Sequence, residues 1–416
     1  MKSSRDIVRR NSKKLYAAGI ILFLLFISVS VSMSAQQPPV IDGCPIFPAN
    51  NAWNTPIDHL PLDLNSAAYI ATIGATRGLH PDFASGTWDG GPIGIPFNVV
   101  SGSQQKVDVT FDYDDESDPG PYPLPPDALI EGGSQSGGDR HVLVLDRDNC
   151  MLYETWSSYI QPDGSWQAGS GAVFDLNSNT LRPYGWTSAD AAGLPVLPGL
   201  VRYDEVASGE IRHAIRFTAP QTRNTFVWPA RHYASDRTGG NYPPMGQRFR
   251  LKSGFDISQF SPELQVIFLA MKKYGIILAD NGSAWYISGV PDPRWDDDML
   301  VSGFSRVRGA DFEAVDASGL IIQSDSGEAC ASLPVRSSGA YYDDLSLAYD
   351  ALPSDGGLIQ SQAVVIVESP DFSKNISVTI QGGYACNYST VIGSSIIRGT
   401  ITISGGTVTL DGISIE

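Results

Sequence analysis

Residues 142–145 form an apolar run, Val-Leu-Val-Leu, in a part of the chain that is rich in turn residues. A strand with one solvated face would alternate apolar and polar side chains, so this run predicts a strand that is covered on both sides. The polar residues 146–149 favour a tight turn, and an apolar run resumes at Cys150. The pattern therefore predicts a hairpin through the middle of a β-rich core.

The chain enters this predicted strand through Asp139, Arg140 and His141. Because neighbouring residues of a strand point to opposite faces, Asp139 and His141 would share one side and Arg140 would take the other. The same alternation over residues 211–217 places His213 on an apolar face, with the arginines of that segment opposite. An acid beside an imidazole is a candidate for acid–base chemistry.

Local signals predict several further elements. The Asn281-Gly282 pair between two apolar runs predicts a second hairpin. Caps, first-turn prolines and terminal glycines predict only short helices. The predicted helices are residues 66–73 with Asn65 as cap, one or two turns over residues 202–209, a helix opened by Ser261-Pro262-Glu263 and ended by Gly275, and a short helix over residues 344–352.

Glycine and proline recur along the chain, with 42 and 28 copies, so the runs between turns are short. This spacing predicts a mainly β protein whose main domain, residues 40–316, is a β-sandwich or is barrel-like, with a few short helices. The composition shifts near residues 317–326, after which three strand-and-glycine units follow. These units predict a small C-terminal β-solenoid-like module over residues 320–416, for surface display, oligomerisation or attachment.

The first 35 residues predict a secretion signal that is removed from the fold. Basic residues precede an apolar run over residues 17–31, and small residues end the segment. An uncleaved membrane anchor is the alternative, although the run is short for a span. We expect a secreted or cell-surface protein with no integral membrane domain after cleavage.

The charge of the chain narrows the class of partner. The whole sequence carries −17, and the predicted signal holds six basic residues and one acid, so the exported part carries about −22. Such a charge argues against nucleic acid and against anionic membrane surfaces. It does not identify a substrate.

Four cysteines, Cys44, Cys150, Cys330 and Cys386, remain after the signal. None forms a close pair, which argues against a zinc cluster or a dithiol redox site. Export favours disulfides. Three pairings are possible, and the simplest joins Cys44 to Cys150 and Cys330 to Cys386.

The densest acidic run, residues 112–120, is a candidate calcium loop, because hard cations bind several oxygens on a bending chain. It lacks the bidentate glutamate at the twelfth position that an EF-hand loop needs, since Pro123 stands there. A solvated loop is the simpler interpretation. We therefore expect no cofactor, with calcium as the one alternative.

Polar residues beside the predicted strands supply the candidate catalytic groups. If the strands are neighbours, an acid could orient an imidazole and an arginine could stabilise negative charge. A histidine near an apolar strand is more often a hydrogen-bonded structural residue, and a metal bound by His141, His213 and His232 lacks any standard spacing. The candidate catalytic residues are Asp139, His141, Glu205, His213, Arg231 and Asp280.

Other catalytic signatures are missing from the sequence. It has no serine-elbow pattern, and its glycine pairs fit β-turns rather than phosphate-binding loops. Eight tryptophans and 17 tyrosines would suit stacking on sugar rings, although most such rings fill cores. These features favour a polysaccharide or cell-envelope glycan as the partner.

Residues from about 47 to 315 resemble a group of uncharacterised exported bacterial proteins. The resemblance implies membership of this exported group but carries no mechanism. The C-terminal segment from Tyr341 resembles the first coils of a parallel β-helix in exported bacterial surface proteins. The stretches that carry the first resemblance are residues 138–141, 192–195, 209–214, 247–251 and 274–276, with Arg202, Glu205 and Asp280.

Two functions follow from these observations. The first is a glycan-cleaving enzyme, a glycoside hydrolase or polysaccharide lyase, whose carboxylate and imidazole groups converge in one groove. The second is a non-catalytic carbohydrate-binding or cell-surface interaction protein with a shallow aromatic platform. Convergence of Asp139, His141, His213 and Arg231 on one concavity distinguishes the first from the second.

Overall fold

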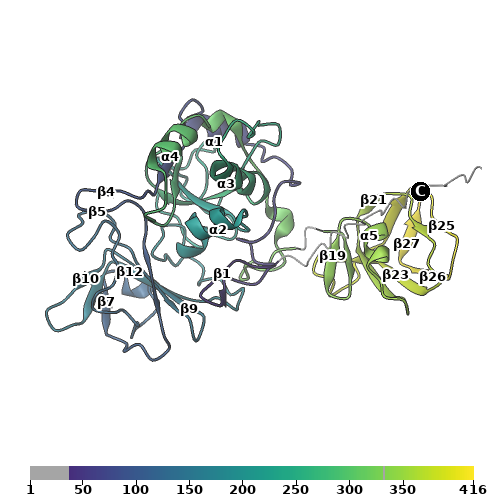
Figure 1. Ribbon diagram of the computed structural model, residues 1–416, viewed down its shortest axis with the longest axis horizontal. Coiled ribbons are helices and arrows are strands. Elements are labelled where there is room, and N and C mark those ends of the chain that lie inside the picture. The colour runs from purple at the N-terminus through teal and green to yellow at the C-terminus, as the bar shows by residue number, and fades with distance from the viewer. Residues whose placement is uncertain (1–36, 331–332) are drawn as a thin grey trace, which may run out of the picture. The chain divides into compact units, whose positions relative to one another are not determined.

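The computed structural model describes residues 37–330 and 333–416 (Figure 1). The predicted signal, residues 1–35, and its alternative as a membrane anchor lie outside these residues. Within them, no helix has both the length and the apolar character needed to cross a bilayer. The described chain is mainly β with a few short helices, as the sequence predicts.

A four-stranded sheet contains the predicted central hairpin. All five residues of β8 are buried, and β8 pairs antiparallel with β9 from Val142 opposite Thr155 to Asp146 opposite Met151. The double-sided cover of the 142–145 run is therefore confirmed. The strands of this sheet, in spatial order, are β12 (Ser170–Asp175), β9 (Met151–Trp156), β8 (Val142–Asp146) and β6 (Phe97–Val100).

A six-stranded mixed sheet forms the second large unit. Contacts place the helix α1 (Ser66–Ile73) on β17, α3 (Pro262–Lys273) on β14 and α4 (Asp297–Phe304) on β3, and the three helices are grouped together in Figure 1. The strands, in spatial order, are β17 (Phe312–Ala314), β14 (Arg248–Leu251), β15 (Ile276–Asn281), β13 (Ile215–Ala219), β16 (Tyr286–Ser288) and β3 (His80–Asp82).

The predicted hairpin at Asn281-Gly282 is wrong. β15 and β16 are not hydrogen-bonded to each other, because β13 lies between them, parallel to β15 and antiparallel to β16. The turn crosses the end of β13 instead: the Gly282 amide donates to the Ala219 carbonyl oxygen and the Trp285 amide donates to Thr218. A turn signal cannot show that a distant strand inserts between its two arms.

Three short sheets accompany these two units within residues 40–168. None of the sheets in the described residues closes on itself, so the barrel-like alternative is not found, and the sandwich stays a prediction. These sheets join β1 (Val40–Ile41) to β2 (Cys44–Pro45), β4 (Thr87–Trp88) to β5 (Gly91–Pro92), and β10 (Tyr159–Ile160) to β11 (Trp166–Ala168) and β7 (Val109–Phe111).

The predicted helices are all present, with ends that differ from the prediction by up to two residues. α1 spans Ser66–Ile73 as predicted, with Gly74 as its C-cap, although the Asn65 side chain makes no capping hydrogen bond. Ser261 caps α3, and its side chain accepts a hydrogen bond from the Leu264 amide. The other helices are α2 (Tyr203–Ser208), which ends at a left-handed Gly209, α5 (Leu345–Asp350), and the 3-10 turns η1 (Asp114–Glu116), η2 (Leu197–Gly199), η3 (Gly309–Asp311) and η4 (Ser318–Leu320).

The C-terminal segment has its own apolar core, which includes Val335, Ile359, Phe372, Ile380 and Ile397. Its later strands pair in parallel in three stacks, as the repeated strand-and-glycine units suggest. The stacks do not by themselves establish a solenoid, and the domain boundary near residue 320 also stays a prediction. The strands are β18 (Val335–Ser337), β19 (Ala340–Tyr342), β20 (Gly357–Gln362), β21 (Val365–Val367), β22 (Asp371–Phe372), β23 (Ser377–Tyr384), β24 (Ser395–Arg398), β25 (Thr402–Ile403), β26 (Thr407–Asp411) and β27 (Ile413–Ile415).

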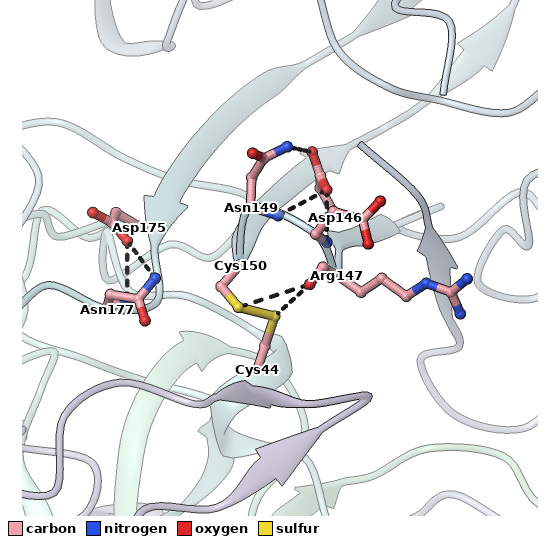
Figure 2. The surroundings of a disulfide bond; sticks show 8 residues. Cys44, Asp146, Arg147, Asn149, Cys150, Asp175 and Asn177 are labelled. Carbon is pink, nitrogen blue, oxygen red and sulfur yellow. Dashed lines mark hydrogen bonds between the residues drawn. A yellow bond between two sulfur atoms is a disulfide. The ribbon is translucent and has the colours of Figure 1, made fainter. Parts of the chain in front are cut away.

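Both disulfides have the simplest predicted pairing, Cys44 with Cys150 and Cys330 with Cys386. Figure 2 shows Cys150 at the end of the β8–β9 turn. That turn is held by the Asp146 carboxylate, which accepts hydrogen bonds from the amides of residues 148 and 149. Two disulfides indicate an oxidising compartment, in agreement with the predicted export.

Replacing Cys44 and Cys150 together with serine is expected to lower the free energy of unfolding by about 2–4 kcal/mol. The bridge joins residues 106 positions apart, so its loss increases the conformational entropy of the unfolded chain by opening a long loop. Urea unfolding monitored by tryptophan fluorescence measures the change. The matched control replaces Cys330 and Cys386, 56 positions apart, and should leave the unfolding of the four-stranded sheet unchanged. Equal unfolding midpoints for the parent and the Cys44/Cys150 variant would contradict this expectation.

Candidate functional site

One face of the six-stranded sheet is polar, which is unusual for strands that are largely buried. The register pairs Thr218 with Asp280 on one side and with Tyr286 on the other, and Tyr286 with His80. Paired residues of neighbouring strands project from the same face of a sheet. These side chains therefore form one row across four strands. Arg216, Ser288 and Asp82 form the neighbouring row, two residues along each strand.

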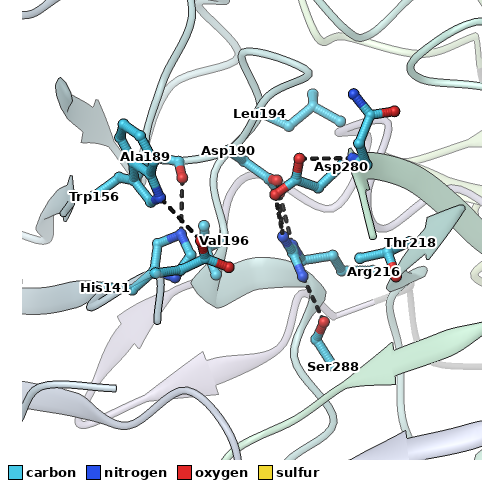
Figure 3. Close-up of polar contacts among 12 residues, drawn as sticks. His141, Trp156, Ala189, Asp190, Leu194, Val196, Arg216, Thr218, Asp280 and Ser288 are labelled. Carbon is cyan, nitrogen blue, oxygen red and sulfur yellow. Dashed lines mark hydrogen bonds and ion pairs between the residues drawn. The ribbon is translucent and has the colours of Figure 1, made fainter. Parts of the chain in front are cut away.

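Arg216 is the centre of this face. Its side chain is 4% exposed and forms a two-point ion pair with Asp190, whose side chain is fully buried. The two hydrogen bonds measure 2.7 Å from Nε to Oδ2 and 2.9 Å from Nη2 to Oδ1. Nη1 donates to the Ser288 hydroxyl at 2.5 Å. The guanidinium is thereby fixed in position and orientation (Figure 3).

Asp280 shares the same guanidinium but is held more weakly. Its Oδ2 lies 3.3 Å from Nη2 of Arg216, and its Oδ1 accepts the Asn281 amide at 2.7 Å. Burial, followed by repulsion from the Asp190 carboxylate, raises the pKa of Asp280 to about 7, against the opposing charge of Arg216. The Asp280 side chain nevertheless keeps 23% of its surface. It is thus a carboxyl group that retains a proton near neutral pH and still meets solvent.

Two histidines fix the loop that carries Asp190. Nε2 of His141 lies 2.9 Å from the Ala189 carbonyl oxygen, and Nδ1 of His232 lies 2.8 Å from that of Ala191. A carbonyl oxygen only accepts, so each of these ring nitrogens carries a proton. Asp190 lies between the two anchored carbonyls, which holds its carboxylate against Arg216.

His141 is a buried imidazolium rather than a free acid or base. Its Nδ1 lies 2.6 Å from Oε2 of Glu131, so both ring nitrogens face acceptors. Burial acts to lower the pKa of His141, but the Glu131 carboxylate outweighs it and raises the pKa to about 9. Burial likewise opposes ionisation of Glu131, and the charge of His141 lowers its pKa below the ordinary value. His141 therefore acts as a positioning residue.

A glycine-rich loop, residues 131–138, connects Glu131 to the strand that follows. Arg140 is buried and holds this loop by donating from Nη1 to the carbonyl oxygens of Ser134 and Ser136. The backbone of Arg140 has φ +54°, so the chain does not alternate there and β8 begins only at Val142. The predicted strand geometry for residues 139–141 is therefore wrong, and Asp139 does not bond to His141.

Asp139 and Asp82 are the exposed acids of the site. Oδ1 of Asp139 accepts a hydrogen bond from Nε1 of Trp156 at 3.3 Å. The Asp139 charge contributes to the raised pKa of both Asp82 and Asp280, so all three carboxyl groups interact. For Asp82, burial and then the Glu131 charge are the larger causes.

We name this group the Arg216 cluster. It brings together three of the six predicted catalytic residues and adds four that the sequence analysis did not select. The sequence did contain a signal for one of the four, Asp82. In a strand, residues 80 and 82 point to the same face, so His80 and Asp82 form the same kind of imidazole–acid pair as was proposed for His141 and Asp139. The cluster consists of Asp82, Glu131, Asp139, His141, Asp190, Arg216 and Asp280.

His213 and Glu205 belong to a different arrangement. Nε2 of His213 lies 3.1 Å from Oε2 of Glu205 and 3.2 Å from Nη2 of Arg202, while Nδ1 lies 2.7 Å from the Ala214 carbonyl oxygen. Residue 213 precedes β13, so the predicted strand over residues 211–217 begins later than expected, at Ile215. Burial opposes ionisation of Glu205, but Arg202 and His213 lower its pKa. Among the described residues, no hydrogen bond links the side chains of Arg202, Glu205 or His213 to the Arg216 cluster.

Arg231 is also separate. Its guanidinium donates to the carbonyl oxygens of Arg182 and Ser324 at 2.8 Å and to Asp325 at 2.7 Å. All three nitrogens are used to connect two loops. None of these hydrogen bonds joins Arg231 to Asp139, His141 or His213, and the predicted convergence of the four residues on one concavity stays a prediction.

Glu154 is a further buried acid near the cluster. Its carboxylate accepts the amides of Val196 and Leu197 at 2.8 Å each and so fixes the start of η2. Burial raises the pKa of Glu154 to about 7, although the two amide hydrogen bonds oppose the shift. Because this side chain is fully buried and bonded to backbone, it supports the site without meeting solvent.

The described residues contain no group of three or more histidine, cysteine, aspartate or glutamate side chains arranged to hold a metal ion. Within the predicted calcium loop, Asp118 pairs with Arg182 and Glu116 accepts the Thr187 amide. A pocket of about 720 Å³ lies between α3 and the segment after α2 and is lined by Glu210, Lys273 and Tyr274 among others. None of the residues that line it belongs to the Arg216 cluster. We place the candidate site at the Arg216 cluster, because fixed and shifted ionisable groups mark reactive sites more directly than volume does.

Comparisons of the chain with protein-family models, with curated proteins and with solved structures find no match. No residue roles can therefore be carried over from another protein. The resemblance to exported bacterial proteins stays a prediction, and the functional argument depends on the geometry alone.

Proposed function

We propose that this protein is an exported enzyme that hydrolyses glycosidic bonds, with Asp280 as the general acid and Asp139 as the second carboxyl group. The observation that supports the proposal is that Asp190 and Asp280 bind Arg216 unequally. Asp190 takes the two short hydrogen bonds, so the neighbouring Asp280 retains a proton while remaining partly exposed. Glycoside hydrolysis uses one carboxylic acid that donates a proton and a second carboxyl group on the other side of the scissile bond.

The surroundings support this assignment of roles. Asp139 is exposed, and it accepts a hydrogen bond from the Trp156 ring nitrogen, which orients its carboxylate. His141 and His232 bond to the carbonyl oxygens on either side of Asp190 and fix its position. Asp190 in turn keeps Arg216 in place through the reaction. His141 and Glu131 position the loop and do not transfer protons. The net negative charge of the exported chain and its disulfides suit an extracellular setting.

A non-catalytic carbohydrate-binding protein is the second candidate. Two aromatic rings, Trp88 and Tyr184, are 80% and 75% exposed and could support a sugar without cleaving it. For the C-terminal segment, we propose the first coils of a parallel β-helix used for attachment at the cell surface. The three parallel stacks, β20–β23–β26, β21–β24–β27 and β22–β25, support that proposal.

Incubating the exported chain with a panel of neutral, amine-bearing and acidic polysaccharides tests the catalytic proposal. We expect new reducing ends from at least one polysaccharide, and a loss of about 100-fold or more in rate for Asp139→Asn. The matched control, Asp355→Asn, changes an exposed acid before β20 and should keep the parent rate. Polysaccharide binding without any product from the parent would favour the binding protein instead.

A further inference from the structure

The pocket of about 720 Å³ beside α3 has the size of a small-molecule site. Such sites typically enclose roughly 300–1,000 Å³ and combine apolar walls with a few polar groups. α2 and α3 contact each other beside this pocket and are neighbours in Figure 1. Its aliphatic wall consists of Ile211, Leu251, Val266, Leu269 and Ala270.

Tyr274, at the end of α3, supplies a polar group without a partner. Its side chain lines the pocket and the residue is only 1% exposed, yet the hydroxyl forms no hydrogen bond with any described residue. A buried tyrosine hydroxyl usually has a partner. This hydroxyl is not fully enclosed by protein atoms, so it meets the pocket. Burial, followed by the charge of Glu210, raises the pKa of Tyr274, so the hydroxyl keeps its proton and can donate.

Two cations at the pocket also have unused donors. Lys273 is exposed, and its Nζ lies 5.1 Å from the centre of the Tyr274 ring. Its side chain forms no hydrogen bond or ion pair with a described residue. Arg250 donates from Nε to Glu313 and from Nη1 to the carbonyl oxygens of residues 57, 58 and 60, which leaves Nη2 without a partner in the described chain.

The two acids that line the pocket have partners of their own. Glu210 pairs with Nε of Arg212 at 2.7 Å, and Oδ1 of Asp58 lies 3.4 Å from Nδ1 of His59. The unused groups of the pocket are therefore donors, two of them cationic. An ionised carboxylate only accepts hydrogen bonds, so it complements such a set.

We propose that this pocket binds a small amphipathic carboxylate, which accepts a hydrogen bond from Tyr274, pairs with Lys273 and lays its apolar body against the aliphatic wall. The inference does not depend on the proposed glycan-cleaving activity. An amine of the same shape would meet Lys273 with a like charge. A neutral alcohol would bond to Tyr274 but leave the ammonium of Lys273 without an acceptor.

Isothermal titration of the exported chain with octanoate, 1-octanol and octylammonium tests the charge preference at constant chain length. We expect octanoate to bind at least about fivefold more tightly than 1-octanol at low salt, since one ion pair at about 4 Å in water gives a factor of this size. Added salt should reduce the difference. A fourth probe, 3-phenylpropionate, distinguishes an aromatic from an aliphatic acid, and tighter binding of either acid than of 1-octanol supports the inference.

Tyr274→Phe removes only the hydroxyl and should weaken octanoate binding about tenfold, because a hydrogen bond to a charged group is lost. The unfolding midpoint without ligand should not change, since the hydroxyl has no protein partner to lose. Lys273→Gln should weaken binding about fivefold and remove its salt dependence. The matched controls, Tyr113→Phe and Lys106→Gln, alter exposed side chains outside the pocket and should bind octanoate like the parent.

Leu269→Glu provides a check at a position that is 52% exposed, where the fold tolerates a polar side chain. Its negative charge and lost apolar contact should weaken octanoate binding at least tenfold. Octylammonium binding as tightly as octanoate, an unchanged octanoate affinity in Tyr274→Phe or Leu269→Glu, or no binding of either acid would each overturn the inference. Asp280→Asn should bind octanoate like the parent, so failure of the catalytic proposal and failure of this one are separate results.

Discussion

Asp190→Asn is expected to lower the free energy of unfolding by about 3–5 kcal/mol at neutral pH. The substitution leaves Arg216 buried, with only 4% of its side chain exposed, and removes the carboxylate that forms its two short hydrogen bonds. An uncompensated buried charge costs more than the ion pair contributes. Chemical unfolding of the parent and the variant at pH 7 measures the difference.

The matched control is Glu210→Gln, which removes an ion pair with Arg212 in which both side chains are nearly half exposed. It should cost less than about 1 kcal/mol, because exposed pairs contribute little. If Asp190→Asn costs no more than this control, Arg216 is not the buried centre that we describe. Asp280 is also expected to ionise in Asp190→Asn and partly replace the lost carboxylate. A double variant that also carries Asp280→Asn should then be less stable than the sum of the two single effects gives, even though Asp280→Asn alone is expected to stabilise the protein.

Local signals in the sequence predict the local parts of this fold. The 142–145 run gives a strand buried at every position, α3 begins at its Ser261 cap, and α1 ends before Gly74. These features depend on neighbouring residues alone. Both disulfides have the simplest of the three pairings that the sequence leaves open, although the sequence alone does not choose among them.

The candidate site depends on distant partners that no local pattern encodes. Arg216 bonds to residues 26 and 64 positions away, and the strand that carries it inserts between the arms of the predicted Asn281-Gly282 hairpin. Alternation did place Arg216 opposite the apolar residues of its strand. Alternation could not show that this second face of the strand is also buried. Burial there turns Arg216, a residue type usually found at the surface, into the centre of the cluster. His213 was assigned to a strand wrongly, because β13 begins only at Ile215, two residues after this histidine.

Asp280→Asn is expected to separate activity from stability, because the two should change in opposite directions. If Asp280 is the general acid, the variant should cleave glycans about 100- to 10,000-fold more slowly. The parent rate should fall as the pH rises through about 7, where the acid loses its proton. Initial rates measured from pH 5 to 9 on the substrate of the parent test both statements.

The stability change follows from the raised pKa of Asp280. The folded protein holds a proton on this carboxyl up to about pH 7, whereas the unfolded chain releases it near the ordinary value of 3.8. The native state therefore binds more protons between these limits, so the carboxyl lowers stability progressively as the pH rises from about 4 to 7. Asparagine stays neutral and avoids this loss. Asp280→Asn should match the parent near pH 4 and exceed it by about 1–3 kcal/mol above pH 7.

Unfolding curves at pH 4 and pH 8 for the parent, Asp280→Asn and Asp355→Asn test this sign directly. The control should show the same difference between the two pH values as the parent. An Asp280→Asn protein that is less stable than the parent at pH 8 would mean that Asp280 is an ionised partner of Arg216. It could not then donate a proton, and the catalytic assignment would fail together with the stability expectation. A more stable and inactive variant is the combination expected when a site retains a destabilising group for its chemistry.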